Sequence, residues 1–249
     1  MDSKVIDIFI TTYLRQVYTE KTISYLYERT KYPFRLFVID NGGNDEVLTE
    51  AVKQNKVFLW IKNSANIGIH ASWNLALSMA ESEYFITSDN DIYVPDLFPS
   101  WLTQMLTFMD ERPNYGAISL HPHIFIGAAG IDPNDPEDVK ERNMCGAVMR
   151  IMRTDIVRRV GGWEHAIRTS RNNEEITICS KLHDAGYLTG IASRIRAYHP
   201  FGKDIIGNLG WGYNTITSEE QGHRPELKDE VLRYDNPDAY DEKTWLPKI

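Results

Sequence analysis

Cysteine is scarce in this 249-residue sequence, and no stretch of it is both long and apolar. Its two cysteines, Cys145 and Cys179, cannot build a disulfide framework, and their spacing fits no zinc motif. The longest uncharged stretch, 113–131, contains two His, two Pro and three Gly, which excludes a membrane span. The N-terminus carries Asp2 and Asp7 where a signal peptide needs a basic head, and no Asn-x-Ser/Thr motif occurs. We therefore expect a cytoplasmic protein with no transmembrane segment.

Positive charge is also in short supply, with 27 Lys and Arg against 35 Asp and Glu and a net charge of −8. This balance argues against a nucleic-acid partner, which requires a basic face, and against attraction to an anionic membrane. The apolar fraction of 42% and charged fraction of 25% are ordinary for a globular protein. We expect one domain over residues 1–217, followed by an acidic extension over 218–249 that wraps the surface or is partly disordered.

Apolar, strand-like runs alternate with helical patterns in the first half of the chain. Short connections between them predict right-handed crossovers and a parallel sheet covered by helices. Ligands bind beyond the carboxyl ends of the strands in such sheets, which selects the segments 11–15, 40–44 and 88–91. The predicted strands are 5–10, 34–39, 57–61 and 84–87, and the predicted helices are 19–30, 46–54 and 70–80.

The pattern changes after about residue 110. Strands are predicted at 117–120, 145–152, 188–192 and 195–198. A short helix over 154–160 has Thr154 as its predicted N-cap, and a helix over 173–185 ends at Gly186 in a left-handed conformation. The Gly- and Pro-containing segment 127–143 is interpreted as a mobile loop.

The sharpest chemical signal is Ser88-Asp89-Asn90-Asp91, directly after a predicted buried strand. Residues i and i+2 of an extended segment point to the same side, so Asp89 and Asp91 can hold one divalent cation. Mg²⁺ and Mn²⁺ favour a few carboxylates together with substrate phosphate oxygens. The alternative is that both acids only shape a turn before Pro95. The position at a strand end favours the metal site.

Two further segments bear polar groups at the same predicted edge. Asp40 ends a strand before Gly42-Gly43, where its carboxylate can accept from a base N–H or a ribose hydroxyl. The alternative is that Asp40 caps the next helix. Gly68, within 63–74, lets backbone approach a phosphate just before a helix begins, although the segment taken alone favours an ordinary loop with Asn and Gly turn residues.

The second half supplies a glycine turn, paired acids and a histidine. Gly161-Gly162-Trp163 precedes Glu174-Glu175 at a helix start, which suggests a sugar-stacking Trp and a carboxylate base. The helix dipole stabilises acids at that position in any case, and Trp163 can equally belong to the core. His199 closes a strand and becomes a candidate ligand only if that strand end faces Asp91.

In this order the segments resemble the inverting family 2 glycosyltransferases of the GT-A fold. The resemblance covers about residues 4–203 and rests on the order of seven motifs, none of which is specific alone. Two positions depart from the family pattern: Glu175 stands where the family has Asp, and Thr177 replaces a second Asp of that helix.

The resemblance implies an α/β fold of the GT-A (Rossmann-like) type, with a mostly parallel central sheet flanked by helices and a C-terminal extension. It implies a metal-dependent enzyme that moves a hexosyl group from a nucleotide-diphosphate sugar to an acceptor hydroxyl with inversion. A UDP-sugar is favoured over a GDP-sugar as donor, and the acceptor is an unknown glycan, lipid or protein. Acceptor specificity is expected in 127–143 and after Gly202.

The resemblance also implies roles for individual residues. Glu175 is the general base with Glu174 in reserve, Trp163 binds the acceptor, and Asp91, His199 and Asp89 bind Mn²⁺ or Mg²⁺. The implied nucleotide-sugar-binding residues are Thr11, Tyr13, Arg15, Asp40, Asn66, Gly68, Asn74, Asp89 and Asn90.

Two other classes of function remain open. A sugar nucleotidyltransferase also pairs acids with a metal on an α/β sheet, but it usually has a Gly-rich loop after the first strand, and 11–15 contains no Gly. A pseudo-transferase that only binds nucleotide sugar or glycan would be indicated by loss of the metal acids or the base, and both are present.

Overall fold

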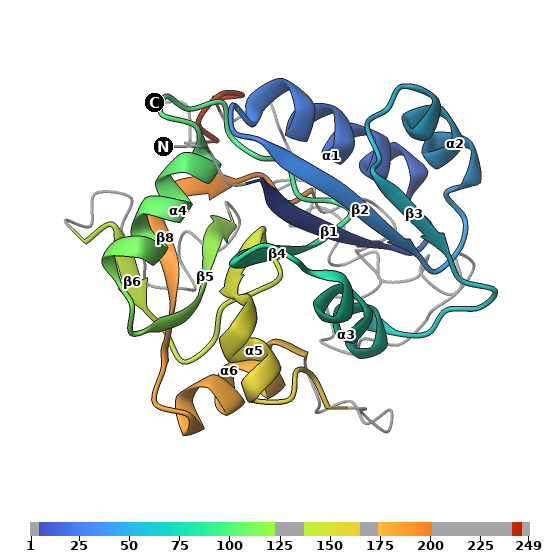
Figure 1. Ribbon diagram of the computed structural model, residues 1–249. Helices are drawn as coiled ribbons and strands as arrows, with labels where there is room; N and C mark the ends of the chain where they lie inside the picture. The colour runs from blue at the N-terminus through green and yellow to red at the C-terminus, as the bar shows by residue number, and fades with distance from the viewer. Residues whose placement is uncertain (1–4, 123–136, 165–173, 201–240, 246–249) are drawn as a thin grey trace, which may run out of the picture.

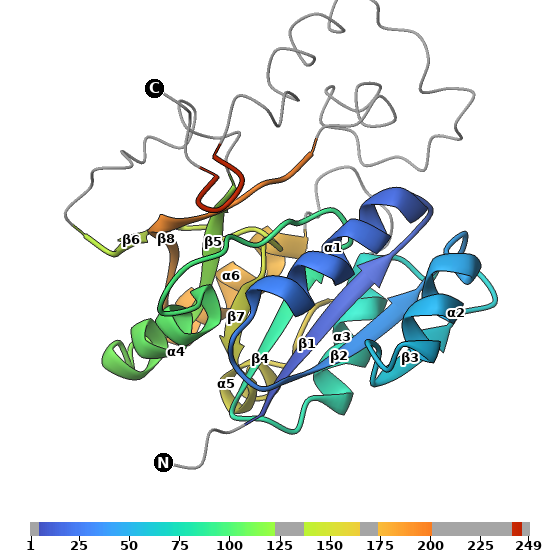
Figure 2. The ribbon, with the colours of Figure 1, turned by 90° about the horizontal axis from the view of Figure 1, so that it is seen from above.

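The computed structural model describes residues 5–122, 137–164, 174–200 and 241–245. One mixed sheet runs through this part of the chain in the order β3-β2-β1-β4-β7-β5-β8-β6, with helices on both faces (Figures 1 and 2). The strands are β1 Ile6–Thr12, β2 Phe34–Asp40, β3 Leu59–Lys62, β4 Tyr84–Asp89, β5 Tyr115–Pro122, β6 Val139–Glu141, β7 Arg150–Arg153 and β8 Leu188–Ala197. The helices are α1 Gln16–Arg29, α2 Asp45–Lys53, α3 Ile69–Met79, α4 Trp101–Glu111, α5 Thr154–Arg159 and α6 Glu174–Asp184.

The first half forms the predicted parallel sheet. Strands β3, β2, β1 and β4 are parallel neighbours, and the helices between them are the crossovers. Thr12 is paired with Asp40, and Thr11 is paired with Asp89. The carboxyl ends of β1, β2 and β4 therefore lie in one row, and this row brings together the segments that the sequence singled out.

The second half makes the sheet mixed. β7 is antiparallel to both β4 and β5, β8 is parallel to β5, and β6 is antiparallel to β8. The predicted mostly parallel α/β sheet is confirmed.

Alternation along the strands divides the core into two layers. Ile8 and Ile10 of β1 face the layer covered by α1, α2 and α4, whereas Phe9 faces the layer covered by α3, α5 and α6. Figure 1 shows α1 and α2 on the opposite side of the sheet from α3, α5 and α6. Both faces are thus buried, as the apolar character of these strands requires.

The strand predicted at 145–152 is wrong in its first half, because β7 begins at Arg150. Met149 has a φ of +46°, which interrupts the extended backbone. The preceding residues pass beside the end of β4, where the Asp89 N–H donates to the Ala147 carbonyl at 3.2 Å and the Met149 N–H donates to Ser88 Oγ at 3.3 Å. This irregular stretch lies alongside the acidic end of β4.

Two other predictions near the sheet edge need correction. Residues 139–141 of the predicted loop form β6, because they pair with β8, while 123–136 lie outside the described residues. The strands predicted at 188–192 and 195–198 are one strand, β8, whose register shifts between Leu120 and His121 of its partner β5. Pairing therefore continues through the irregularity that divides the sequence pattern.

The helices differ from the prediction in smaller ways. Thr154 is the first residue of α5 rather than its N-cap, and its hydroxyl donates to the Ser82 carbonyl at 2.7 Å. Helix α4 was not predicted, although it buries Leu102, Met105 and Leu106 with helical spacing. Gly186 follows α6 with a φ of +84°, which confirms its predicted left-handed conformation.

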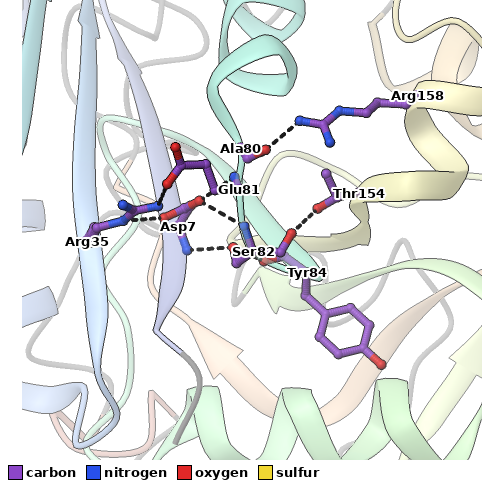
Figure 3. A network of polar contacts seen from close by, with 8 residues as sticks. All are labelled: Asp7, Arg35, Ala80, Glu81, Ser82, Tyr84, Thr154 and Arg158. Atoms are coloured by element: carbon purple, nitrogen blue, oxygen red, sulfur yellow. Dashed lines mark hydrogen bonds and ion pairs between the residues drawn. The ribbon is translucent and has the colours of Figure 1, made fainter.

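The amino-terminal edge of the sheet carries a closed polar network (Figure 3). Asp7 is fully buried; its Oδ1 accepts from Arg35 Nε at 2.8 Å, and its Oδ2 accepts the backbone N–H groups of Glu81 at 2.8 Å and Ser82 at 3.2 Å. Ser82 Oγ in turn accepts the Asp7 N–H at 3.1 Å. This network fixes the start of β1 against the turn before β4.

Residues 241–245 belong to the predicted acidic extension and pack on the fold. Trp245 is 2% exposed, and its ring lies 4.8 Å from that of Tyr198 and 6.1 Å from that of Tyr25. The extension from residue 218 stays a prediction as a separate unit, since 218–240 and 246–249 lie outside the described residues. No helix in the described part of the chain is long and apolar enough to cross a membrane.

Candidate active site

Asp91 lies at the centre of a charged cluster beyond the end of β4. Its Oδ2 accepts from Arg15 Nη1 at 2.7 Å, and its Oδ1 lies 3.3 Å from His199 Nε2. The Asp91 side chain is 1% exposed, while those of Arg15 and His199 are 28% and 23% exposed. The strand end that carries His199 therefore faces Asp91, which was the condition for treating His199 as a candidate ligand.

The charges of this cluster act on one another. Burial, and then the charge of Asp91, raises the pKa of Asp89 to about 7. Burial also opposes ionisation of Asp91, but His199 and Arg15 outweigh it and hold the pKa of Asp91 below its ordinary value. The pKa of His199 is raised, because Asp91 and Asp89 outweigh its burial. These shifts favour an ionised Asp91 and a protonated His199 beside it, with Arg15 on the other oxygen of Asp91.

The donor atoms at this strand end suit a divalent cation. Two carboxylates and an imidazole offer the hard oxygen and nitrogen ligands that Mg²⁺ and Mn²⁺ accept. Among the described residues no three acids, histidines or cysteines already converge as a ligand set. The residue types fit the cation, whereas Arg15 holds one oxygen of the central acid.

Asp40 provides a hydrogen-bond acceptor in the same row. Its Oδ1 accepts from Thr12 Oγ1 and from the Gly42 N–H, both at 2.9 Å. Its Oδ2 is buried and takes no hydrogen bond. A buried acceptor without a donor is unfavourable, so this oxygen is well placed to receive an N–H from a ligand.

Asn90 is 5% exposed and makes contacts within the protein, and its predicted contact with a donor stays a prediction. Its amide nitrogen donates to Thr19 Oγ1 at 2.7 Å and to the Leu14 carbonyl at 3.2 Å. The main-chain carbonyl of Asn90 accepts from Thr22 Oγ1 at 2.9 Å. The residue between the two acids therefore clamps the first loop and helix α1 to the end of β4.

The remaining predicted donor-binding positions differ in accessibility. Tyr13 is 43% exposed at the carboxyl end of β1, whereas Thr11 is buried. Asn66 Oδ1 accepts the Gly68 N–H at 2.8 Å, and Gly68 has a φ of +81° at the start of α3. This turn is the predicted Asn-Gly loop before a helix, and its contact with a donor stays a prediction.

Asn74 and the glycine turn are joined on one face of the sheet. The Asn74 side chain accepts the Trp163 N–H at 2.9 Å and donates to the Trp163 carbonyl at 2.7 Å. Gly162 has a φ of +62°, and a Cβ there would lie 2.5 Å from Asn74 Oδ1. Asn74 therefore holds the turn after α5 on α3, and only glycine fits at 162.

Trp163 is buried in the core and is not available for stacking on an acceptor sugar. It is 2% exposed and packs in the layer beneath α3, α5 and α6, with the Arg150 guanidinium 5.5 Å from its ring. This packing corrects the predicted acceptor contact and matches the core alternative.

The paired acids of α6 have different environments. Glu174 is 6% exposed, and burial, followed by the charges of Glu175 and Asp89, raises the pKa of Glu174 to about 8. Glu175 is half-buried, and its Oε1 accepts the Ala147 N–H at 3.3 Å. Gly146 makes this approach possible, because a Cβ there would lie 2.9 Å from Glu175 Oε1. The charge of Glu175 contributes to the raised pKa of Asp89, and the charge of Asp89 contributes to the raised pKa of Glu174.

Arg150 is a site neighbour that the sequence analysis missed. It is fully buried. Its Nη1 donates to the Cys145 carbonyl at 3.2 Å, while its Nε and Nη2 donate no hydrogen bond. Its charge lowers the pKa of Glu174 against the effect of burial. An arginine at the start of a strand gives no signal in the sequence, because its contacts with the Cys145 carbonyl and the Trp163 ring arise only in the folded chain.

Comparisons with known proteins agree with this geometry. Residues 7–172 match the family model described as Glycosyl transferase family 2, which is more than half of the chain. An uncharacterized glycosyltransferase of Haemophilus influenzae is 24% identical over 125 residues, which cover 49% of this chain and 38% of that protein. The chain thus spans well under half the length of this relative.

Solved structures show the same fold. The mannosyltransferase PcManGT of Pyrobaculum calidifontis, in complex with GDP-Man and Mn²⁺, aligns with a TM-score of 0.64 at 16% identity over 78% of this chain and 56% of that one. S. aureus TarS 1-349 in complex with UDP-GlcNAc aligns with a TM-score of 0.60 at 16% identity over 93% of this chain and 72% of that one. The sheet and its helices are those of a GT-A glycosyltransferase fold. The chain belongs to glycosyl transferase family 2.

Proposed function

We propose that the protein transfers a hexosyl group from a nucleotide-diphosphate sugar to an acceptor hydroxyl, with inversion and with a divalent cation. The observation that carries this proposal is the single row of acids at the carboxyl edge. Asp40 ends β2, Asp89 ends β4 and Asp91 follows two residues later. The acids of α6 lie near Asp89. The separate segments of the sequence thus meet at one site.

The donor end of the site is built around Asp40 and Asp91. Asp40 Oδ2 would accept an N–H of the base, for which uracil is the favoured candidate. Asp91 and His199 would hold Mn²⁺ or Mg²⁺ directly, with Asp89 toward the ribose or the cation's water shell. When bound, the cation supplies positive charge that stabilises the diphosphate leaving group.

Glu175 is the base that this site supports best. A general base must be ionised before it takes the acceptor proton. Glu174 is buried with a pKa of about 8, so it is mostly protonated at pH 7 and holds its proton. Glu175 is more accessible than Glu174 and lies in the first turn of α6. Glu175 would remove the hydroxyl proton as the acceptor attacks from the face opposite the diphosphate.

Donor turnover tests the proposal. The protein is incubated with Mn²⁺ and a panel of UDP- and GDP-sugars, and released nucleotide is measured by mass spectrometry. Released nucleoside diphosphate from one donor supports the proposal. A parallel incubation contains a nucleoside triphosphate and a sugar phosphate, and pyrophosphate formed there would instead identify a nucleotidyltransferase. Tight binding without turnover of any donor would identify a binding protein.

Calorimetry decides between uracil and guanine as the base of the nucleotide. UDP and GDP are titrated under identical Mn²⁺ concentrations and again with excess chelator. Tighter binding of UDP that depends on Mn²⁺ is expected, whereas tighter binding of GDP would overturn the uracil assignment. The neighbours do not settle this point, since one was solved with GDP-Man and another with UDP-GlcNAc.

A further inference from the structure

Arg15 occupies an oxygen of the acid to which the cation is assigned. Arg15 Nη1 lies 2.7 Å from Asp91 Oδ2, and the Asp91 side chain is 1% exposed. The same guanidinium acts on the ionisation of Asp89 and His199. Every group assigned to the cation therefore lies within the electrostatic influence of this arginine.

A buried carboxylate needs a positive partner, because leaving its charge unpaired away from water is unfavourable. Asp91 has that partner in Arg15, with His199 on its other oxygen. A divalent cation at Asp91 would lie within a few ångströms of the Arg15 guanidinium. Two positive groups that close repel strongly in a poorly solvated site. The cation and the Arg15 contact are thus alternatives at Asp91.

The backbone that carries Arg15 is held apart from the contact with Asp91. Leu14 and Arg15 have φ values of +57° and +61°, a left-handed conformation that is unfavourable for residues other than glycine. Contacts to main-chain carbonyls hold this conformation, since the Leu14 carbonyl accepts from Asn90 Nδ2 and the Arg15 carbonyl accepts the Thr19 N–H. The loop backbone therefore does not depend on the ion pair, and the Arg15 side chain is 28% exposed.

We propose that Arg15 is the counter-ion of Asp91 in the cation-free protein and that a divalent cation must displace it from Asp91. This inference rests on the proposed function, which assigns the cation to Asp91. A diphosphate would offer the displaced guanidinium new oxygen partners of opposite charge. Cation and nucleoside diphosphate therefore bind cooperatively, and the cation alone binds more weakly than its ligands would otherwise allow.

The test is direct titration of Mn²⁺ into the protein without nucleotide. Binding is measured by calorimetry and by the electron paramagnetic resonance signal of the free ion. Arg15→Met removes the charge and keeps an aliphatic side chain. It is expected to bind Mn²⁺ roughly tenfold more tightly than the unaltered protein, with Arg15→Lys between the two. Asp91→Asn is expected to abolish this binding. Thermal unfolding of each variant checks that it is folded.

A matched control exists in the same sheet. Arg35 makes a 2.8 Å ion pair with buried Asp7, and its side chain is 27% exposed, against 28% for Arg15. Arg35→Met should leave Mn²⁺ affinity unchanged. Mn²⁺ affinity of Arg15→Met equal to or weaker than that of the unaltered protein, including no binding by either, overturns the role of Arg15. The proposed function fails separately, if no donor is turned over at any Mn²⁺ concentration.

A second measurement concerns cooperativity. Mn²⁺ affinity is compared with and without saturating UDP, and the ratio of the two constants is the coupling. Arg15→Met is expected to reduce this ratio by about tenfold, because it has no guanidinium to transfer to the diphosphate. An unchanged ratio contradicts the proposal even where Mn²⁺ binding itself is altered.

Discussion

The two ends of the central sheet carry the same pair of residue types and treat them differently. At the amino end Arg35 pairs with buried Asp7 at 2.8 Å, and at the carboxyl end Arg15 pairs with buried Asp91 at 2.7 Å. Two backbone N–H groups also bind Asp7, whereas the recorded partners of Asp91 among other residues are side chains. Backbone donors cannot move without moving the fold. An acid held by side chains can exchange its partners, as the proposed cation site at Asp91 requires.

The largest expected effect lies at the functional end. Glu175→Gln keeps the shape of the side chain and its hydrogen bonding but cannot take a proton. We expect sugar transfer to slow by ~10²–10⁴-fold, with donor and Mn²⁺ binding unchanged. Single-turnover kinetics and calorimetry measure the two quantities. If Glu174→Gln abolishes turnover and Glu175→Gln does not, the base is Glu174; if neither matters, the inverting mechanism is in doubt.

The next effect separates the two aspartates in binding. Asp91→Asn should weaken Mn²⁺-dependent binding of a nucleoside diphosphate by at least about tenfold, or ~1.4 kcal/mol, because a neutral amide is a poor cation ligand. Asp7→Asn should leave this binding unchanged. Titration of UDP with Mn²⁺ into both variants provides the measurement. Equal losses in the two variants would remove the distinction between the two ends.

The order of the two variants should be reversed when stability is measured, so that Asp7→Asn loses more than Asp91→Asn. Asp7→Asn turns an amide donor toward the Glu81 and Ser82 N–H groups or leaves Arg35 without its acceptor. We expect a loss of roughly 1–3 kcal/mol in the free energy of unfolding. Asp91→Asn should cost less, since the groups of other residues that contact Asp91 are side chains, which can reorient, rather than backbone N–H groups. Urea unfolding of both variants is the check, and a larger loss for Asp91→Asn would contradict the assignment.

The last effect concerns Glu174 and appears only at the upper end of the pH range. Its pKa of about 8 in the folded protein exceeds the unfolded value near 4.3, so the folded state binds the proton more tightly. Stability is therefore lost as pH rises from about 4.3 to 8. Glu174→Gln should be more stable than the unaltered protein at pH 8, on the order of 1–3 kcal/mol, and the gain should shrink toward pH 5. Thermal unfolding at both pH values measures it, and a gain independent of pH would argue against a protonated Glu174.

Sequence patterns predicted the first half of the fold and the row of acids well. Local rules were sufficient there, because strands and helices alternate and each acid follows an apolar strand. They failed at 145–149 and within β8, where the conformation depends on pairing with distant strands. Side-chain direction was also beyond local rules. The burial of Trp163 and the inward turn of Asn90 are set by α3 and α1, which no spacing in the sequence reveals.

The site's pairs were predictable only in part. The position of His199 opposite Asp91 could be stated as a condition, because both follow strands that end on the same edge. The contact between Arg15 and Asp91 could not, since it requires two consecutive left-handed residues that are not glycine. Such a conformation is rare enough that sequence propensity argues against it.

The burial of Trp245 links residues 241–245 to the candidate site. The Trp245 ring lies 4.8 Å from that of Tyr198, the residue before His199, and its indole N–H donates to the Val94 carbonyl at 3.3 Å. Tyr198 in turn pairs with Tyr93 through two backbone hydrogen bonds of 2.8 and 2.9 Å. Residues 241–245 therefore brace the strand end that carries His199 against the segment that follows Asp91. Replacing Trp245 by a small residue would loosen a candidate ligand that lies on another part of the chain.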